Sequence, residues 1–371
     1  MAAHSSILPA ISRAAPKCRW RDLYNEAELY KCAVRLYTKP LFSWRKALLT
    51  STDKKDLYDF ARRGPQNLAA IHGALQKETF TFRPGVALHR NFRGKKRTLY
   101  IYPWEERLVD LLLYRLLSAR FHHRFSENSY AYRLRGFGLD RCQHKIAALL
   151  ASANSPLFVA KRDIASYFPS VDQTLLLHQL QQIVEPDDYL FQLLHQRVRF
   201  QFEESGAIQT SLRGIPFGTP IACFFANLYL TPLDRQLDSI PSLHYLRYAD
   251  DLLFFSEQKE AVVEAVARFD AVLTERRLSS KASHEQNLLL SRSPQHAEGF
   301  TTASRFRHLG LEFSASVKFA SPATNAGKSA TFFVTPFAAA APNSPASSIS
   351  ASVLNSPSNS PAAPSTTASV T

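Results

Sequence analysis

The chain has 371 residues, of which 45% are apolar and 20% are charged, a composition typical of one large globular domain or two smaller ones. Its 45 lysines and arginines outnumber its 31 aspartates and glutamates, and the resulting net charge of +14 indicates a polyanionic partner such as nucleic acid. No apolar run approaches the ~18 residues that span a bilayer, so we expect no membrane partner.

The cysteines point to a reducing compartment. Cys18, Cys32, Cys142 and Cys223 lie too far apart in the sequence for a Cys-x-x-Cys zinc site or a secreted disulfide framework. The first twenty residues lack the apolar core of a secretory signal, because Pro9 interrupts the only short apolar run. We therefore expect a cytoplasmic protein.

Composition divides the chain into three segments. Residues 1–75 are predicted to form a helical N-terminal extension, in which aromatic and aliphatic residues are mixed with charged ones. Residues 76–314 mix helical and strand-like patterns. In the last segment, 315–371, Ala, Ser, Pro and Thr make up 37 of the 51 residues from 321 onwards. Such a segment buries too little apolar surface to offset the entropy of ordering it, so we expect a disordered tail.

Two helices and two strands are predicted inside the middle segment. Apolar residues recur at helical spacing after Pro103, from Val109 to Leu116, and again from Val262 to Leu273. Short apolar runs at 157–160 and 245–248 have the β-branched and aromatic content of buried strands. The fold class is therefore α+β.

Three acidic residues stand at the ends of these strands. Asp163 follows the first strand, and Asp250 and Asp251 form the tip of a predicted hairpin. Neighbouring carboxylates in an apolar setting repel one another, so a cation is needed, and Mg²⁺ prefers such oxygen ligands. The alternative is structural, since paired aspartates are common in turns.

A glycine-rich loop lies between the acids. Gly214, Pro216 and Gly218 predict a tight turn, and Thr219 with Pro220 predicts the start of a helix. A loop of this kind suits a close approach to phosphate or to a template strand.

In this order the motifs resemble the palm of a reverse transcriptase. The acidic segment 161–172, the Gly-Pro-Gly loop, the Tyr248-Ala249-Asp250-Asp251 hairpin and the segment Phe306–Phe313 all match. The basic segment 95–99 and the Ser129–Arg133 segment are similar to the fingers of prokaryotic members. The resemblance covers roughly residues 75–314. It implies a right-hand polymerase with fingers and palm, a helical N-terminal region and no recognisable thumb.

The resemblance also implies roles for individual residues. Asp163, Asp250 and Asp251 would bind two Mg²⁺ ions, or Mn²⁺ in their place, helped by the backbone carbonyl of Ile164. Phe168 would exclude a ribose 2′-hydroxyl by its bulk. The remaining positions would contact the nucleotide or the template. Lys96 and Arg97 would bind the triphosphate, with a solvated basic loop as the alternative, and Phe217 stands where many relatives have Gln. Gly218 would act through its backbone and Asn227 would face the cleft from its helix, or both would be structural. Lys281 and His284 are weak candidates for the proton donor to pyrophosphate.

The implied activity is RNA-directed DNA polymerase, a nucleotidyltransferase that adds dNTPs to a DNA or RNA primer on an RNA template. The apolar Phe217 with the helix that follows is most similar to retrons, diversity-generating elements and unclassified or phage-defence groups, whose template is in some cases a specific non-coding RNA. The abrupt change of composition leaves three alternatives for the thumb: its absence, its replacement by a partner or folded RNA, or a lost reading frame. Two other functions stay open, a catalytically impaired RNA-binding accessory protein and an RNA-templated RNA polymerase.

Overall fold

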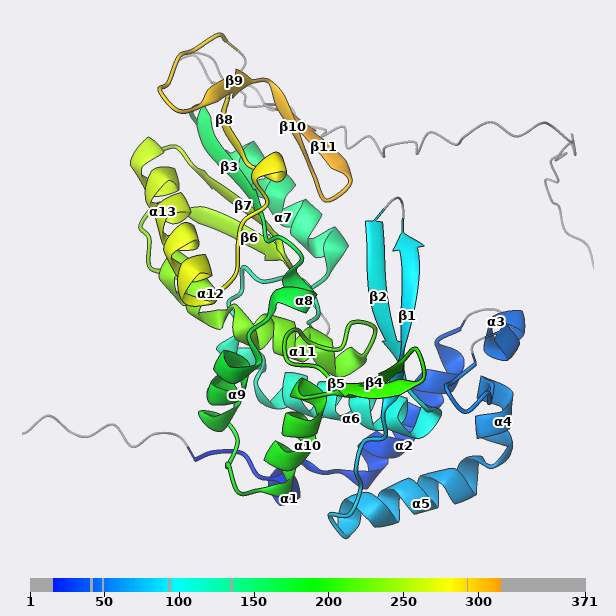
Figure 1. The fold of residues 1–371 in the computed structure, drawn as a ribbon. Helices are drawn as coiled ribbons and strands as arrows, with labels where there is room; N and C mark the ends of the chain where they lie inside the picture. Colours follow the sequence, from blue (N-terminus) through cyan, green and yellow to red (C-terminus); the bar gives the residue numbers. More distant parts are fainter. Residues whose placement is uncertain are drawn as a thin grey trace, which may run out of the picture.

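The computed structural model describes residues 16–40, 43–48, 50–92, 95–133, 136–291 and 293–314. The first fifteen residues and the low-complexity tail expected from 315 onwards therefore lie outside the described residues. The described part is a mixed α+β fold, as the sequence predicted (Figure 1).

Helices form the N-terminal layer. Asn25 caps one of them by accepting a hydrogen bond from the backbone of Glu28, and Asp56 forms a reciprocal capping box with Asp59 at another. Leu29 and Cys32 are buried in the core, where their helix packs against α6 (Trp104–Arg120). The five helices are α1 (Trp20–Leu23), α2 (Glu26–Thr38), α3 (Ser43–Leu48), α4 (Leu57–Arg62) and α5 (Gly64–Gln76).

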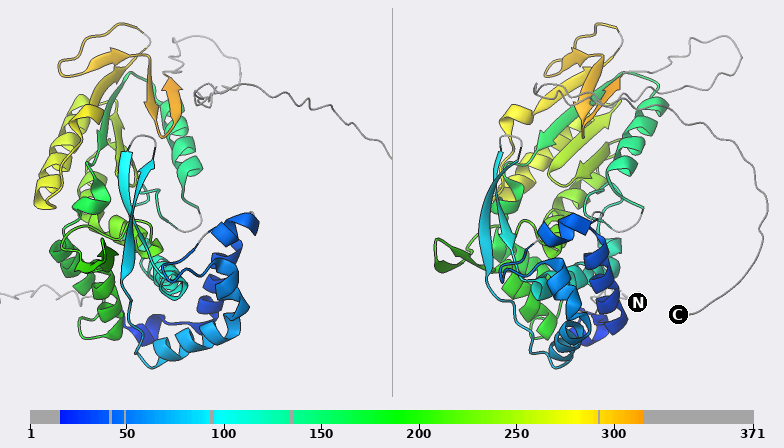
Figure 2. Two further views of the ribbon diagram at one scale, coloured as in Figure 1. Left: turned by 45° about the vertical axis from the view of Figure 1, so that its right-hand side comes forward. Right: turned by 90° about the vertical axis from the view of Figure 1, so that its right-hand side faces the viewer.

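The fingers contain a four-stranded sheet in the order β2-β1-β4-β5. Its strands are β1 (Gly85–Phe92), β2 (Lys95–Ile101), β4 (Gln201–Glu204) and β5 (Ala207–Thr210). The β1–β2 hairpin projects alongside the palm sheet (Figures 1 and 2). The helices beneath it are α6 (Trp104–Arg120), which includes the predicted 109–116 helix, and α9 (Gln173–Gln181) and α10 (Tyr189–Val198).

The palm is a five-stranded sheet in the order β6-β7-β3-β8-β9. Its strands are β3 (Leu157–Asp163), β6 (His244–Tyr248), β7 (Asp251–Ser256), β8 (Gln286–Leu290) and β9 (Thr301–Ala303). Both predicted strands are present, and so is the predicted helix 262–273, as α13 (Lys259–Glu275).

The two faces of the palm sheet are covered differently. Ala160 and Phe254 pack with α13 and with α11 (Pro220–Tyr229) on one face. Val159 and Phe255 pack with α7 (Leu139–Ser152) on the other. Because side chains alternate along a strand, Asp163 lies on the same face as Val159, the α7 face.

A second hairpin covers the end of the α7 face. It consists of β10 (Arg305–His308) and β11 (Leu311–Ser314), and its Phe306 and Phe313 stack at a centroid distance of 5.5 Å inside the core beside α7. Gln143 of α7 donates to the carbonyl of Leu309 at the hairpin tip, at 2.9 Å. The remaining helical elements are α8 (Tyr167–Ser170), α12 (Thr231–Asp238), η1 (His122–Arg124) and η2 (Ala282–His284). None of the helices in the described ranges has the length and apolar run needed to cross a bilayer.

Candidate active site

The strand register brings the three acids together. In the antiparallel β3–β7 pair, Asp163 lies directly opposite Asp251. Asp250 occupies the turn between β6 and β7, and its carbonyl accepts a hydrogen bond from the backbone N–H of Ile164 at 3.1 Å. The chain therefore joins two distant segments at one point of the palm, where the sequence predicted a strand end and a hairpin tip.

The carboxylates at this point influence one another. Burial, followed by the negative charges of Asp250 and Asp163, raises the pKa of Asp251 to about 6. The positive charges of Lys161 and His284 act in the opposite direction. A hard divalent cation with oxygen ligands would relieve this repulsion, so the donor set fits Mg²⁺.

The side chain of Asp163 already has a cationic neighbour. Its Oδ2 lies 2.7 Å from Nδ1 of His284 and 3.9 Å from Nζ of Lys281. Within the described ranges no three side chains among His, Cys, Asp and Glu are gathered closely enough to form a ready-made metal site. Oδ2 of Asp163 is thus paired with His284, and the sharing of a cation between Asp163 and Asp251 stays a prediction.

The segment after α13 is tied to β3 by its backbone. The N–H of Lys281 donates to the carbonyl of Asp163 at 2.8 Å, and the N–H of Ala165 donates to Ser279 at 2.9 Å. Nζ of Lys281 lies 2.9 Å from Nε2 of His284. Both proposed proton donors thus stand beside the first acid, while their role in proton transfer stays a prediction.

A buried arginine holds the turn that carries Asp250. The guanidinium of Arg247 makes two hydrogen bonds to Asp234, at 2.8 and 2.6 Å, and donates to the carbonyl of Ala249 at 3.2 Å. Ala249 has a φ of 60°, a left-handed conformation that is costly for a residue other than glycine. No role was predicted for this pair from the sequence, although the arginine inside the apolar run 245–248 is a signal for it.

The predicted position of Asn227 is wrong. Its side chain is buried in the core of the palm, where its amide donates to the carbonyl of Ala131 at 2.8 Å and its oxygen accepts from Arg247 at 3.2 Å. The predicted helix is present as α11, but its interior face carries this residue. Asn227 therefore supports Arg247 instead of facing the nucleotide.

The glycine-rich loop packs on the segment that contains Phe168. Gly214 has a φ of 80°, and a Cβ at this position would lie 2.9 Å from the carbonyl oxygen of Phe168. The N–H of Ile215 donates to that same oxygen at 3.0 Å. The ring of Phe168 meets the ring of Phe217 edge-on at 5.2 Å. The predicted nucleotide-selecting residue and the loop therefore form one packed unit.

The same loop joins the palm to the fingers. The N–H of Tyr100 donates to the carbonyl of Phe217 at 3.0 Å, and Gly218, at a φ of 106°, lies against this strand. The guanidinium of Arg97 lies 5.5 Å from the Phe217 ring. Lys96 precedes Arg97 on β2, so its side chain points to the opposite sheet face. Of the two, Arg97 lies beside the loop, and the contact of both cations with a triphosphate stays a prediction.

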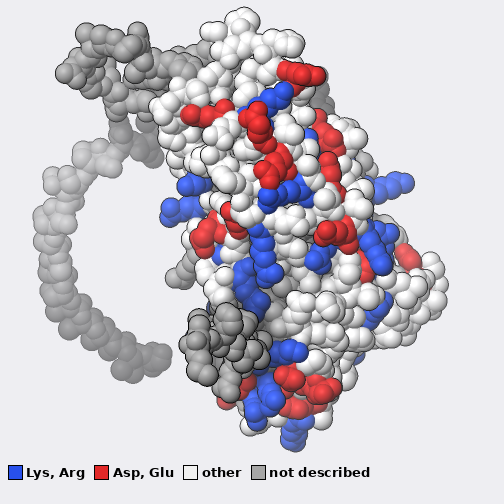
Figure 3. Space-filling view, turned by 90° about the vertical axis from the view of Figure 1, so that its left-hand side faces the viewer, with Lys and Arg blue, Asp and Glu red and all other residues white. Residues whose placement is uncertain are grey.

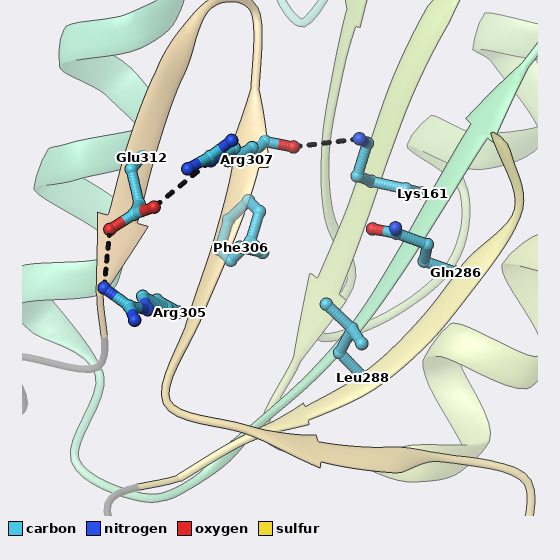
Figure 4. Close-up of a pocket in the computed structure, with 7 residues that line it drawn as sticks. All are labelled: Lys161, Gln286, Leu288, Arg305, Phe306, Arg307 and Glu312. Atoms are coloured by element: carbon cyan, nitrogen blue, oxygen red, sulfur yellow. Dashed lines mark hydrogen bonds and ion pairs between the residues drawn. The ribbon is translucent and has the colours of Figure 1, made fainter. Parts of the chain in front are cut away.

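A pocket of about 430 Å³ opens on the α7 face of the palm (Figure 4). Lys161, two residues before Asp163, lines it and donates to the carbonyl of Arg307 at 2.8 Å. Arg305 and Arg307 each lie 3.2 Å from Glu312. The pocket is thus lined by one cationic side chain of β3, Lys161, and by two of the β10–β11 hairpin, Arg305 and Arg307.

The chain is similar to known proteins. A family model described as "Reverse transcriptase (RNA-dependent DNA polymerase)" matches residues 80–313. The "Uncharacterized 91 kDa protein in cob intron" of Schizosaccharomyces pombe is 24% identical over 170 residues, which are 46% of this chain and 20% of that protein.

Two solved structures of apo telomerase from Candida tropicalis are also similar. The form truncated from its C-terminal domain has a TM-score of 0.47 and 10% identity, covering 72% of this chain and 62% of the telomerase chain. The other has a TM-score of 0.47 and 12% identity, covering 63% and 47%. The chain thus spans less than two thirds of each of these relatives. Because the family model matches more than half of its length, the chain belongs to the reverse transcriptase (RNA-dependent DNA polymerase) family.

Proposed function

We propose that this protein is an RNA-directed DNA polymerase that adds dNTPs to the 3′-hydroxyl of a DNA or RNA primer. The observation that carries the proposal is the register of β3 and β7, which sets Asp163 opposite Asp251 beside Asp250. Three carboxylates at the ends of palm strands are the arrangement that nucleotidyl transfer requires, and the family model supports this assignment.

The proposed metal ligands are Asp163, Asp250 and Asp251, with the carbonyl of Ile164. Two Mg²⁺ ions bound there, or Mn²⁺ in their place, would stabilise charge on the attacking hydroxyl and on the pyrophosphate. Arg247 keeps the Asp250 turn in its left-handed conformation through Ala249. The chain's own contribution is therefore to position the acids before substrate arrives.

The surrounding residues select and align the substrates in this proposal. Phe168, held edge-on against Phe217, would oppose a 2′-hydroxyl on the incoming sugar. Arg97 presents a planar fork suited to phosphate oxygens above the same loop. Lys161, with Arg305 and Arg307 across the pocket, offers cations to the backbone of the primer strand.

We propose a retroelement as the biological setting and a phage-defence system as the alternative. The similar protein of fission yeast is described as lying in an intron, which favours the retroelement. A specific non-coding RNA is the proposed template, and we place the protein in a prokaryotic group and in the cytoplasm. All four cysteines are free thiols, three of them buried, which agrees with a reducing compartment.

A primer-extension assay tests the activity. Purified protein with MgCl₂ should incorporate dTTP on poly(rA) primed with oligo(dT), and should incorporate UTP far more slowly. Asp250→Asn should reduce incorporation by at least about 10³-fold, because it removes a carboxylate at which transition-state charge is stabilised. The matched control is Asp140→Asn, an exposed acid on α7.

Three outcomes would contradict the proposal. Equal synthesis by Asp250→Asn and wild type would show that Asp250 is not a metal ligand needed for the reaction. Preference for UTP would identify an RNA polymerase on the same palm. Binding of the RNA template without incorporation of either nucleotide would identify an inactive accessory protein.

A further inference from the structure

The positive charge of the chain is concentrated in the N-terminal helices. Residues 16–77 contain 13 lysines and arginines against 6 acids, a net charge of +7 in 62 residues. Residues 80–313, which match the family model, contain 29 against 24, a net charge of +5 in 234 residues. This uneven distribution indicates that the helical layer has a polyanionic partner of its own.

Helix α2 presents much of this charge in an ordered arrangement. Its inner side, which includes Leu29 and Cys32, is buried, so its outer side faces solvent. Tyr30 and Val34 are 43% and 64% exposed and follow one another at a spacing of four residues. Lys31, Arg35 and Lys39 form the next ridge at the same spacing. We call these five residues the α2 face.

Of the three cations of the α2 face, Lys31 is paired with Glu28 of its own helix at 3.4 Å, whereas Arg35 and Lys39 are not paired in this way. Among the described residues, no carboxylate lies within 4 Å of the side chains of Arg35, Lys39 or Lys46. Nζ of Lys46 lies 3.9 Å from the ring centre of Tyr37 and 5.9 Å from that of Tyr58. Basic groups next to accessible aromatic rings therefore extend from α2 to α3 and α4.

The palm offers a contrast. On the side of the molecule that carries α13, basic and acidic side chains are interspersed (Figure 3). Helices α3 and α4 instead lie near the foot of the β1–β2 hairpin, on which Arg97 stands (Figures 1 and 2).

We propose that the α2 face binds a single-stranded segment of the RNA template. This inference rests on the proposed function, which supplies RNA as the partner. Arg35 and Lys39 would contact successive phosphates, and Tyr30 would stack on a base. Single strands are favoured because their bases are free to stack, whereas a duplex hides them. The two apolar side chains alone offer too little area for a stable protein interface.

The salt dependence of RNA binding tests the phosphate contacts. The probe is a fluorescent 20-nucleotide oligo(U), titrated without nucleotides at several salt concentrations. Each phosphate contact to a single strand contributes about 0.7 to the slope of log K against log salt, so Arg35→Gln with Lys39→Gln should lower the slope by about 1.4. Arg141→Gln with Lys145→Gln is the matched control, since these exposed cations have the same spacing on α7.

Substitution of Tyr30 tests the stacking contact. Tyr30→Ala should weaken oligo(U) binding by roughly tenfold, and Tyr30→Phe should retain it, because the ring and not the hydroxyl stacks. A blunt RNA duplex of equal length should show a much smaller loss with Tyr30→Ala. Circular dichroism of each variant confirms that the fold is intact.

Three results would overturn the inference. The first is an unchanged salt slope in the Arg35 and Lys39 double variant, and the second is an equal loss of slope in the α7 control. The third is equal competition by polyglutamate, which would identify a general polyanion surface. Because no synthesis is measured, a failure here leaves the primer-extension result unaffected, and an inactive polymerase would still show the slope change.

Discussion

The palm and the N-terminal helices use the same charged residue types in opposite ways. In the palm, Arg247 is fully buried and makes two hydrogen bonds to Asp234, and in the fingers Arg197 is bound to Asp110 in the same manner. On α2, Arg35 and Lys39 are exposed. Charge that is buried and paired fixes geometry, whereas charge that is exposed remains available to a partner.

Because of this difference, substitutions in the two regions should affect different properties, namely stability in the palm and binding on α2. Removing one member of a buried pair leaves an uncompensated charge in a medium of low dielectric. Removing an exposed cation changes the folded state little, but it changes the attraction to a polyanion. The first region should therefore respond to substitution in unfolding experiments, and the second in titrations with RNA.

The largest effect on stability is expected at Arg247. Arg247→Met should lower the free energy of unfolding by about 3–5 kcal/mol, because it leaves Asp234 buried without a partner. Urea denaturation measures the change. The double variant Arg247→Met with Asp234→Leu should lose less than the single one. A loss below about 1 kcal/mol in the single variant would show that the pair does not organise the palm.

A smaller effect, on selectivity, is expected at Phe168. Phe168→Ala should reduce the preference for dTTP over UTP by at least about tenfold, since the ring that opposes a 2′-hydroxyl is removed. The ratio of kcat/KM for the two nucleotides measures it. The ring also packs on Phe217, so the nucleotide ratio and not the absolute rate is the informative quantity. An unchanged ratio would exclude the assigned role.

The pH dependence of stability should reveal a histidine that the palm keeps neutral. Burial and the charge of Lys161 lower the pKa of His308 to about 3. The unfolded chain binds this proton near pH 6.5, so the free energy of unfolding should fall as the pH decreases from about 6.5 towards 3, by up to about 1.4 kcal/mol per pH unit. In His308→Gln the free energy of unfolding should fall less over the same pH range, because the histidine that takes up the proton on unfolding is absent.

Urea denaturation at pH 7 and at pH 5 measures the difference. The exposed His123→Gln serves as the control. If wild type and His308→Gln show the same change between the two pH values, the histidine is not held neutral by the fold.

The smallest effect on stability is expected on α2. Arg35→Gln with Lys39→Gln should change the free energy of unfolding by less than about 0.5 kcal/mol, as is usual for exposed substitutions. The same urea experiment measures it. A large loss would mean that these cations support the fold and that the contrast between the two regions is wrong.

Sequence patterns predicted the elements and the motif positions better than they predicted side-chain partners. Asp163 at a strand end and Asp250 at a hairpin tip follow from local apolar patterns, which set where strands begin and end. The register that sets Asp163 opposite Asp251 is a long-range property; the family resemblance implied only that the three acids act together. The burial of Asn227 depends on the position of Ala131 almost a hundred residues away, which no local pattern contains. The opposite directions of Lys96 and Arg97 follow from strand alternation and could have been predicted.

The most direct test of the central claim is single-turnover incorporation of dTTP by Asp163→Asn on primed poly(rA). Asp163 lies on a different strand from Asp251 and contributes only if the two strands form one catalytic centre. We expect a rate at least about 10³-fold below that of wild type, with binding of the primed template retained. Incorporation at the wild-type rate would contradict it.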